Sequence, residues 1–102
     1  IGCELYRSLI EQYNWNVSIA MAIMQAESGC NHAAVGDNYP IAGLYAPSCG
    51  LFQVRTLTGR PDCESLKDPA TNIKWAYQIS GGGVNWSPWT VFTTGKYAQF
   101  LR

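Results

Sequence analysis

Four cysteines constrain this chain of 102 residues more than any other feature of its sequence. Cys3, Cys30, Cys49 and Cys63 are widely spaced, none of them forms a CxxC pair, and the chain has one histidine. Structural zinc sites usually take their ligands from closely spaced pairs, so we expect no bound metal and no cofactor. An even number of cysteines in so small a chain favours two disulfides and an oxidising compartment. The alternative is four reduced thiols in the core of a cytosolic protein.

Length and composition limit the classes of protein further. A chain of this length forms one compact domain, here residues 1–102, and an apolar content of 47% excludes intrinsic disorder. No apolar run approaches the ~20 residues of a membrane-spanning helix. Seven basic residues balance seven acidic ones without a run of either sign, which argues against binding to nucleic acid or an anionic membrane. Abundant amides, hydroxyls and aromatic rings suit a neutral sugar chain, although a low-charge secreted surface has the same composition.

Apolar residues at helical spacing predict helices over residues 4–13, 17–28 and 69–80. Asn16 is a good N-cap for the second helix and Gly29 is a natural stop for it. Asp68 caps the third helix. A last helical stretch opens at Ser87-Pro88, carries Trp89 and Phe92, and is interrupted at Gly95.

The middle of the chain lacks this periodicity. Residues 30–50 are rich in Gly, Pro, Asn and Ser, and loops of this length in a compact domain are usually functional. The apolar run 51–54 is either a short strand or the start of a turn. The sequence therefore predicts a mainly α fold, α+β at most, with a long central loop and a small β-element.

Four cysteines allow three disulfide connectivities. If the first two helices are antiparallel, Cys3 and Cys30 lie at the same end of the hairpin, which leaves Cys49 to pair with Cys63. We favour this arrangement. The rival pairing of Cys30 with Cys49 would instead tie the end of the second helix to the segment that follows residue 49.

Glu27 does not fit its position in the second helix. Ala20, Ile23, Met24 and Glu27 occupy i, i+3, i+4 and i+7, the face of the helix that should be buried. Desolvation and the helix dipole both favour the neutral form of a carboxyl group at this place, which raises its expected pKa. A protonated acid near neutral pH is what a general acid must be. The alternative is that the apolar stripe ends one turn earlier and the carboxylate is solvated.

Three short motifs resemble those of a known superfamily. Glu27-Ser28-Gly29, Gly50-Leu51-Phe52-Gln53 and Asp68-Pro69-Ala70-Thr71-Asn72-Ile73 occur in the order found in lysozyme-like proteins. The segment from about residue 17 to 80 is most similar to the soluble lytic transglycosylase domain and to its relative, goose-type lysozyme. The resemblance implies a single lysozyme-like domain. It also implies cleavage of the β-1,4 bond between N-acetylmuramic acid and N-acetylglucosamine in peptidoglycan.

The resemblance also implies roles for individual residues. Glu27 would be the catalytic acid that protonates the glycosidic oxygen. Gln53 and Phe52 would line the cleft and bind the sugar, although a structural hydrogen bond from Gln53 to the loop is an equal alternative. Ser28 is a further candidate for substrate contact, but a brace for the turn at Glu27 is the favoured role.

The C-terminal region matches the family less well. The family's Ala-Tyr-Asn-Ala-Gly motif corresponds best to residues 91–95, where Phe92 replaces the tyrosine and Thr93 the asparagine. Tyr97 could supply a phenol from another direction. Trp86 is a candidate for stacking on a sugar face or for the core, whereas Trp89 is assigned to the core.

A second carboxylate would decide the reaction. Glycosidases normally use two carboxylates, whereas a lytic transglycosylase needs one, because a hydroxyl of the substrate attacks the anomeric carbon. Asp37 stands where goose-type lysozymes have a water-positioning aspartate, and as a second catalytic residue it would make the chain a muramidase. The alternative for Asp37 is an ordinary turn residue.

The expected partner is therefore the peptidoglycan glycan strand, bound by a monomer that is secreted, periplasmic or associated with the cell wall. Nucleic acid binding and membrane insertion are not expected. The alternative function is a non-catalytic glycan-binding or structural module on a lysozyme-like scaffold, which the substitutions at residues 92 and 93 favour.

Overall fold

The computed structural model describes residues 2–36 and 46–101. The helical elements in chain order are η1 (Cys3–Tyr6), α1 (Arg7–Ile10), α2 (Val17–Ser28), α3 (Cys63–Leu66), α4 (Pro69–Ile79), α5 (Thr90–Thr93) and η2 (Lys96–Phe100), where η denotes a 3-10 helix. The strands β1 (Val35–Gly36), β2 (Ser48–Cys49) and β3 (Val54–Arg55) form an antiparallel sheet in the order β1-β2-β3. The predicted mainly helical fold with a small β-element is confirmed.

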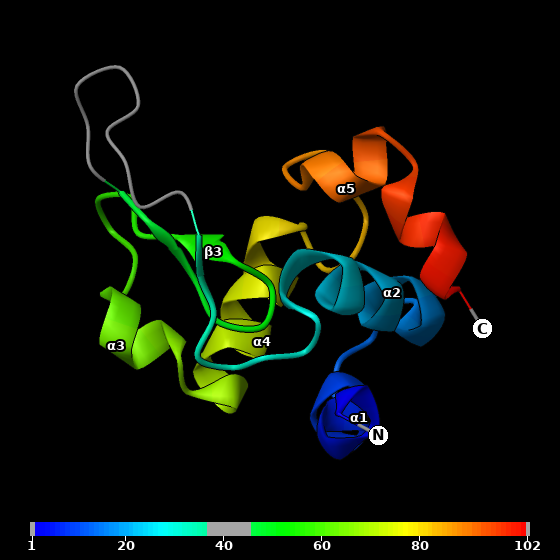
Figure 1. The fold of residues 1–102 in the computed structure, drawn as a ribbon, viewed down its shortest axis with the longest axis horizontal. Coiled ribbons are helices and arrows are strands. Elements are labelled where there is room, and N and C mark those ends of the chain that lie inside the picture. The colour runs from blue at the N-terminus through cyan, green and yellow to red at the C-terminus, as the bar shows by residue number, and fades with distance from the viewer. Residues whose placement is uncertain (1, 37–45, 102) are drawn as a thin grey trace.

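The elements form two groups around α4 (Figure 1). The small sheet and α3 lie on one side of the molecule, and α2, α5 and η2 lie on the other. α4 contacts α3 and β3, while α2 contacts α5 and η2. The radius of gyration of 12.6 Å is that expected of one compact domain of this length.

The second helix follows its sequence signals. The Asn16 side chain accepts a 3.0 Å hydrogen bond from the backbone N–H of Ile19, which satisfies a free donor of the first turn. Gly29 ends α2 in the left-handed conformation, with φ of 62°. Ile23 and Met24 are fully buried, so the predicted apolar face of α2 packs into the core.

The fourth helix is also confirmed. The Asp68 side chain accepts a hydrogen bond of 3.0 Å from the backbone N–H of Thr71, and Pro69 occupies the first position, where its missing N–H costs nothing. Ile73 and Ala76 are fully buried on the face of α4 that packs inward.

Two helical elements differ from the prediction. The helix predicted over 4–13 is instead the 3-10 helix η1 followed by α1, which ends at Ile10. The Ile10 carbonyl accepts from the Tyr13 backbone N–H at 3.2 Å and from the Trp15 indole at 2.8 Å, in place of the bond from residue 14 that a longer helix would form. The short helix α3 was not predicted. Its N-cap is Asp62, whose side chain accepts from the backbone N–H of Ser65.

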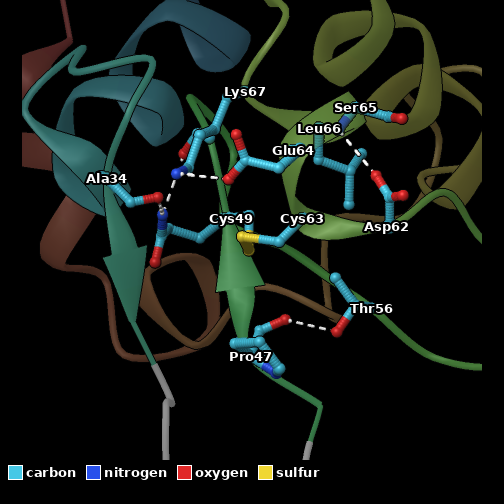
Figure 2. The surroundings of a disulfide bond; sticks show 12 residues. Ala34, Pro47, Cys49, Thr56, Asp62, Cys63, Glu64, Ser65, Leu66 and Lys67 are labelled. Carbon is cyan, nitrogen blue, oxygen red and sulfur yellow. Dashed lines mark hydrogen bonds and ion pairs between the residues drawn. A yellow bond between two sulfur atoms is a disulfide. The ribbon is translucent and has the colours of Figure 1, made fainter.

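Both favoured disulfides are present. Cys3 is bonded to Cys30, which joins η1 to the second residue after the end of α2. Cys49 in β2 is bonded to Cys63 at the start of α3 (Figure 2). The same figure shows the Thr56 hydroxyl donating to the Pro47 carbonyl beside this bridge. The second disulfide therefore fixes the small sheet against α3.

Across residues 2–36 and 46–101, none of the helices is both long enough and apolar enough to cross a lipid bilayer.

Candidate active site

A cleft of about 460 Å³ lies where the small sheet, the C-terminal end of α2 and α5 meet. In Figure 1 the small sheet lies to the left of α2, and α5 lies above it. The described residues that line it are Glu27, Ser48, Gln53, Val54, Arg55, Arg60, Ile79, Pro88, Trp89, Thr90, Val91, Thr94 and Lys96.

Glu27 is the one carboxylate among the described residues that line this cleft. It lies one turn beyond Ile23 on the buried face of α2, and it is half-buried. The apolar stripe of α2 thus extends to the edge of the core, where its last member emerges into the cleft.

Ser28 links the end of α2 to the loop that precedes β3. Its hydroxyl donates to the Leu51 carbonyl oxygen, 2.7 Å away, and the Met24 carbonyl lies 3.2 Å from the same oxygen atom. This is the contact expected of a brace. It fixes the position of residue 51 relative to the turn of helix that carries Glu27.

Asn72 holds the same loop from the opposite side. This fully buried side chain of α4 accepts from the backbone N–H of Phe52 at 2.8 Å, and its amide donates to the carbonyls of Cys49 at 2.7 Å and Leu66 at 2.9 Å. A Cβ at Gly50 would collide with Asn72 and with the Leu66 carbonyl oxygen, and its φ of 82° also favours glycine. Two of the three sequence motifs therefore meet through one buried amide.

Gln53 is held in the left-handed region, with φ of 51°, which a residue other than glycine rarely adopts. Its Nε2 donates to the carbonyls of Ala34 at 3.1 Å and Gly50 at 2.9 Å. A Cβ at Gly36 would lie 2.6 Å from its Oε1. Gln53 thus makes the structural bonds considered above and also lines the cleft.

The structure places two candidate sugar contacts in the core. Phe52 is fully buried and Trp86 is 3% exposed, with their rings stacked at a centroid distance of 6.4 Å. Neither side chain is among those that line the cleft. Trp89 is buried as expected, and its indole donates to the Phe52 carbonyl at 2.8 Å while its surface closes one side of the cleft.

Tyr97 is not among the described residues that line the cleft. Tyr97 is half-buried in η2 and stacks on Phe92, with ring centroids 5.0 Å apart. Asp37 lies outside the described residues. Within those residues no three His, Cys, Asp or Glu side chains are grouped so that they could hold a metal ion.

Sequence reasoning missed the basic side of the cleft. Arg55 from β3, Arg60 from the following loop and Lys96 from η2 all line it. No run or motif marks these three cations, because the fold brings them together from separate segments. The one sequence signal for these cations is negative: none of them lies on a predicted helix face beside an acidic residue with which it could pair.

Comparison with known families identifies the class. A family profile described as "Lysozyme like domain" matches residues 11–91, and the chain therefore belongs to the family of lysozyme-like domains. The match includes the end of α2, the loop before β3 and all of α4. Comparison with curated proteins found no match.

Proposed function

We propose that the chain is a peptidoglycan-cleaving glycosidase, a lytic transglycosylase or muramidase, that acts on the β-1,4 bond between N-acetylmuramic acid and N-acetylglucosamine. The observation that carries this proposal is the half-buried Glu27 in a cleft large enough for sugar residues, in a domain of the lysozyme-like family. Pockets of ~300–1,000 Å³ are typical of ligand sites.

Glu27 acts as general acid and then as general base in this account. Its protonated carboxyl group donates to the glycosidic oxygen, the C1–O bond breaks, and the N-acetylglucosamine side leaves as an alcohol. The carboxylate then accepts a proton from the attacking group. If the attacking group is water, the product has a reducing end. If it is the primary hydroxyl of the muramyl residue, the product is the 1,6-anhydro sugar.

The fixed position of loop 50–53 supports the proposed role of Glu27. Ser28 and Asn72 fix its backbone from two helices, so the rim of the cleft is held rigidly beside Glu27. Preorganised polar groups lower the cost of binding a sugar in one orientation.

A turbidity assay on purified cell walls tests the proposal. We expect the wild-type chain to clear the suspension and Glu27→Gln to lose at least about a thousandfold in rate, since the amide cannot donate the proton. Glu11→Gln is the matched control, because Glu11 is exposed beyond the end of α1, and it should clear walls normally. Equal wall binding by wild type and Glu27→Gln, with no lysis by either, would instead support the non-catalytic module.

A further inference from the structure

The cleft is basic although the chain is neutral. The sequence has seven basic and seven acidic residues, yet the described residues that line the cleft include three of the cations and one carboxylate. Arg55, Arg60 and Lys96 are not needed for protonation of a neutral glycosidic oxygen. Their clustering beside Glu27 therefore calls for a role of its own.

The three cations are not ion-paired with described residues. Among residues 2–36 and 46–101, none of Arg55, Arg60 and Lys96 forms an ion pair. By contrast, Arg7 pairs with Glu4 and Lys67 pairs with Glu64, both on the outer surface of short helices. Among its described residues, the cleft therefore has an excess of basic charge, with Glu27 as the one carboxylate beside three cations.

Arg55 carries an unused donor. Its Nε is buried and has no hydrogen-bond partner in the described part of the chain. Arg60 is held beside it, because Nη1 of Arg60 donates to the Arg55 carbonyl at 3.2 Å. A buried polar atom without a hydrogen-bond partner is rare in folded proteins. An anion bound at Arg55 would supply the missing partner. The planar guanidinium group suits a carboxylate, which it can bind through two parallel hydrogen bonds.

We propose that the cleft selects glycan strands that carry a carboxylate on the lactyl side chain of the muramyl residue, recognised by Arg55, Arg60 and Lys96. This inference rests on the proposed function. Muramic acid is the lactyl ether of glucosamine, so its side chain ends either in the free lactyl acid or in a peptide that bears carboxylates. An N-acetylglucosamine polymer has neither the lactyl acid nor the peptide. The basic charge of the cleft therefore adds nothing to the affinity for that polymer.

Binding to the Glu27→Gln variant tests the inference without turnover. The probes are four tetrasaccharides: chitotetraose, the alternating N-acetylglucosamine–N-acetylmuramic acid form with free lactyl acids, the same form with the lactyl acids converted to neutral amides, and the form with stem peptides. Calorimetry at low salt should show about tenfold tighter binding of a carboxylate form than of the amide. Added salt should reduce this preference, because screening weakens interactions between charges.

The free-acid and peptide arms distinguish the two sources of the carboxylate. Preference for the free acid points to strands without stem peptides, and preference for the peptide form points to strands that retain them. Either result supports the inference. Equal affinity for the amide and for both carboxylate forms overturns it.

Cation variants locate the contact. In the Glu27→Gln background, Arg60→Gln and Lys96→Gln should each reduce the preference for the carboxylate severalfold, with little change in affinity for chitotetraose. These two residues are the safer variants, because Arg55 also belongs to the sheet. Lys74→Gln is the matched control, since Lys74 is exposed on α4 and does not line the cleft. Equal losses in the control and cleft variants would contradict the assignment.

The two proposals fail separately. A chain that cleaves walls in a Glu27-dependent manner but binds acid and amide equally contradicts only the carboxylate inference. A chain that prefers the carboxylate but cleaves no wall contradicts the proposed glycosidase.

Discussion

The Asn72 side chain accepts a 2.8 Å hydrogen bond from the backbone N–H of Phe52, and this contact joins α4 to the loop that borders the cleft. The two residues are 20 positions apart, and both are fully buried. The side-chain oxygen of Asn72 accepts from this loop N–H, and its NH₂ group donates to the carbonyls of Cys49 and Leu66. A buried amide used so fully specifies one position for the loop.

Replacement of Asn72 should therefore destabilise the fold more than replacement of an exposed asparagine. We expect Asn72→Ala to lower the free energy of unfolding by about 2–4 kcal/mol, because the buried N–H of Phe52 and the carbonyl of Leu66 lose this partner. Urea unfolding followed by tryptophan fluorescence measures the change. Asn85→Ala is the control, because Asn85 is exposed and its side chain accepts from the backbone N–H of Ser87, and the substitution should cost less than about 1 kcal/mol. Equal losses in the two variants would show that Asn72 does not hold the loop.

The start of α3 should make stability depend on acid pH. The backbone N–H of Ser65, with the Ser65 side chain as a second cause, lowers the pKa of Asp62 below its ordinary value. The unfolded chain then binds more protons than the folded one between the two pKa values. The stabilisation is fully present above the unfolded pKa of about 3.9 and is lost as pH falls through the folded pKa.

Asp62→Ser tests this dependence, because serine keeps an N-cap acceptor that does not titrate. We expect the urea midpoint of the variant to fall less than that of the wild type when pH is lowered from 5 to about 2. Identical pH dependence of the two midpoints would show that the cap carboxylate contributes nothing to acid unfolding.

The sequence predicted the elements that depend on local signals. Asn16 and Gly29 delimit α2, Asp68 and Pro69 begin α4, and each acts through contacts within a few residues. The disulfide pairing also followed, because it needed only the relative direction of two neighbouring helices. The helix over 4–13 was predicted too long, because helical spacing does not show that the Ile10 carbonyl accepts from Tyr13 and from the indole of Trp15 instead of from residue 14.

Long-range contacts limited the prediction of the site. Nothing near Phe52 or Trp86 shows that each ring is buried against the other, 34 residues away, rather than facing a sugar. The basic side of the cleft depends on segments separated by up to 41 positions, from Arg55 to Lys96. The position of Glu27 could be predicted, because helical periodicity alone places it at the end of the buried stripe.

The effect of replacing Asp37 on the rate of wall clearance should depend on which product the chain releases. If the released fragments have reducing ends, a second carboxylate is needed to position water, and Asp37→Asn should reduce the rate by at least about a hundredfold. If the fragments have 1,6-anhydro ends, Asp37→Asn should leave the rate within about twofold. Initial rates of wall clearance and product masses measure both quantities. Anhydro products formed at a rate that depends strongly on Asp37 would contradict this division of roles.

Mass spectrometry of the fragments released from purified peptidoglycan tests the central claim most directly. We expect disaccharide-peptide fragments cut on the C1 side of N-acetylmuramic acid, with either the reducing-end mass or a mass lower by one water. We also expect that the Glu27→Gln variant releases none of them while remaining folded. Fragments released equally by wild type and Glu27→Gln, or none from either, would contradict the account.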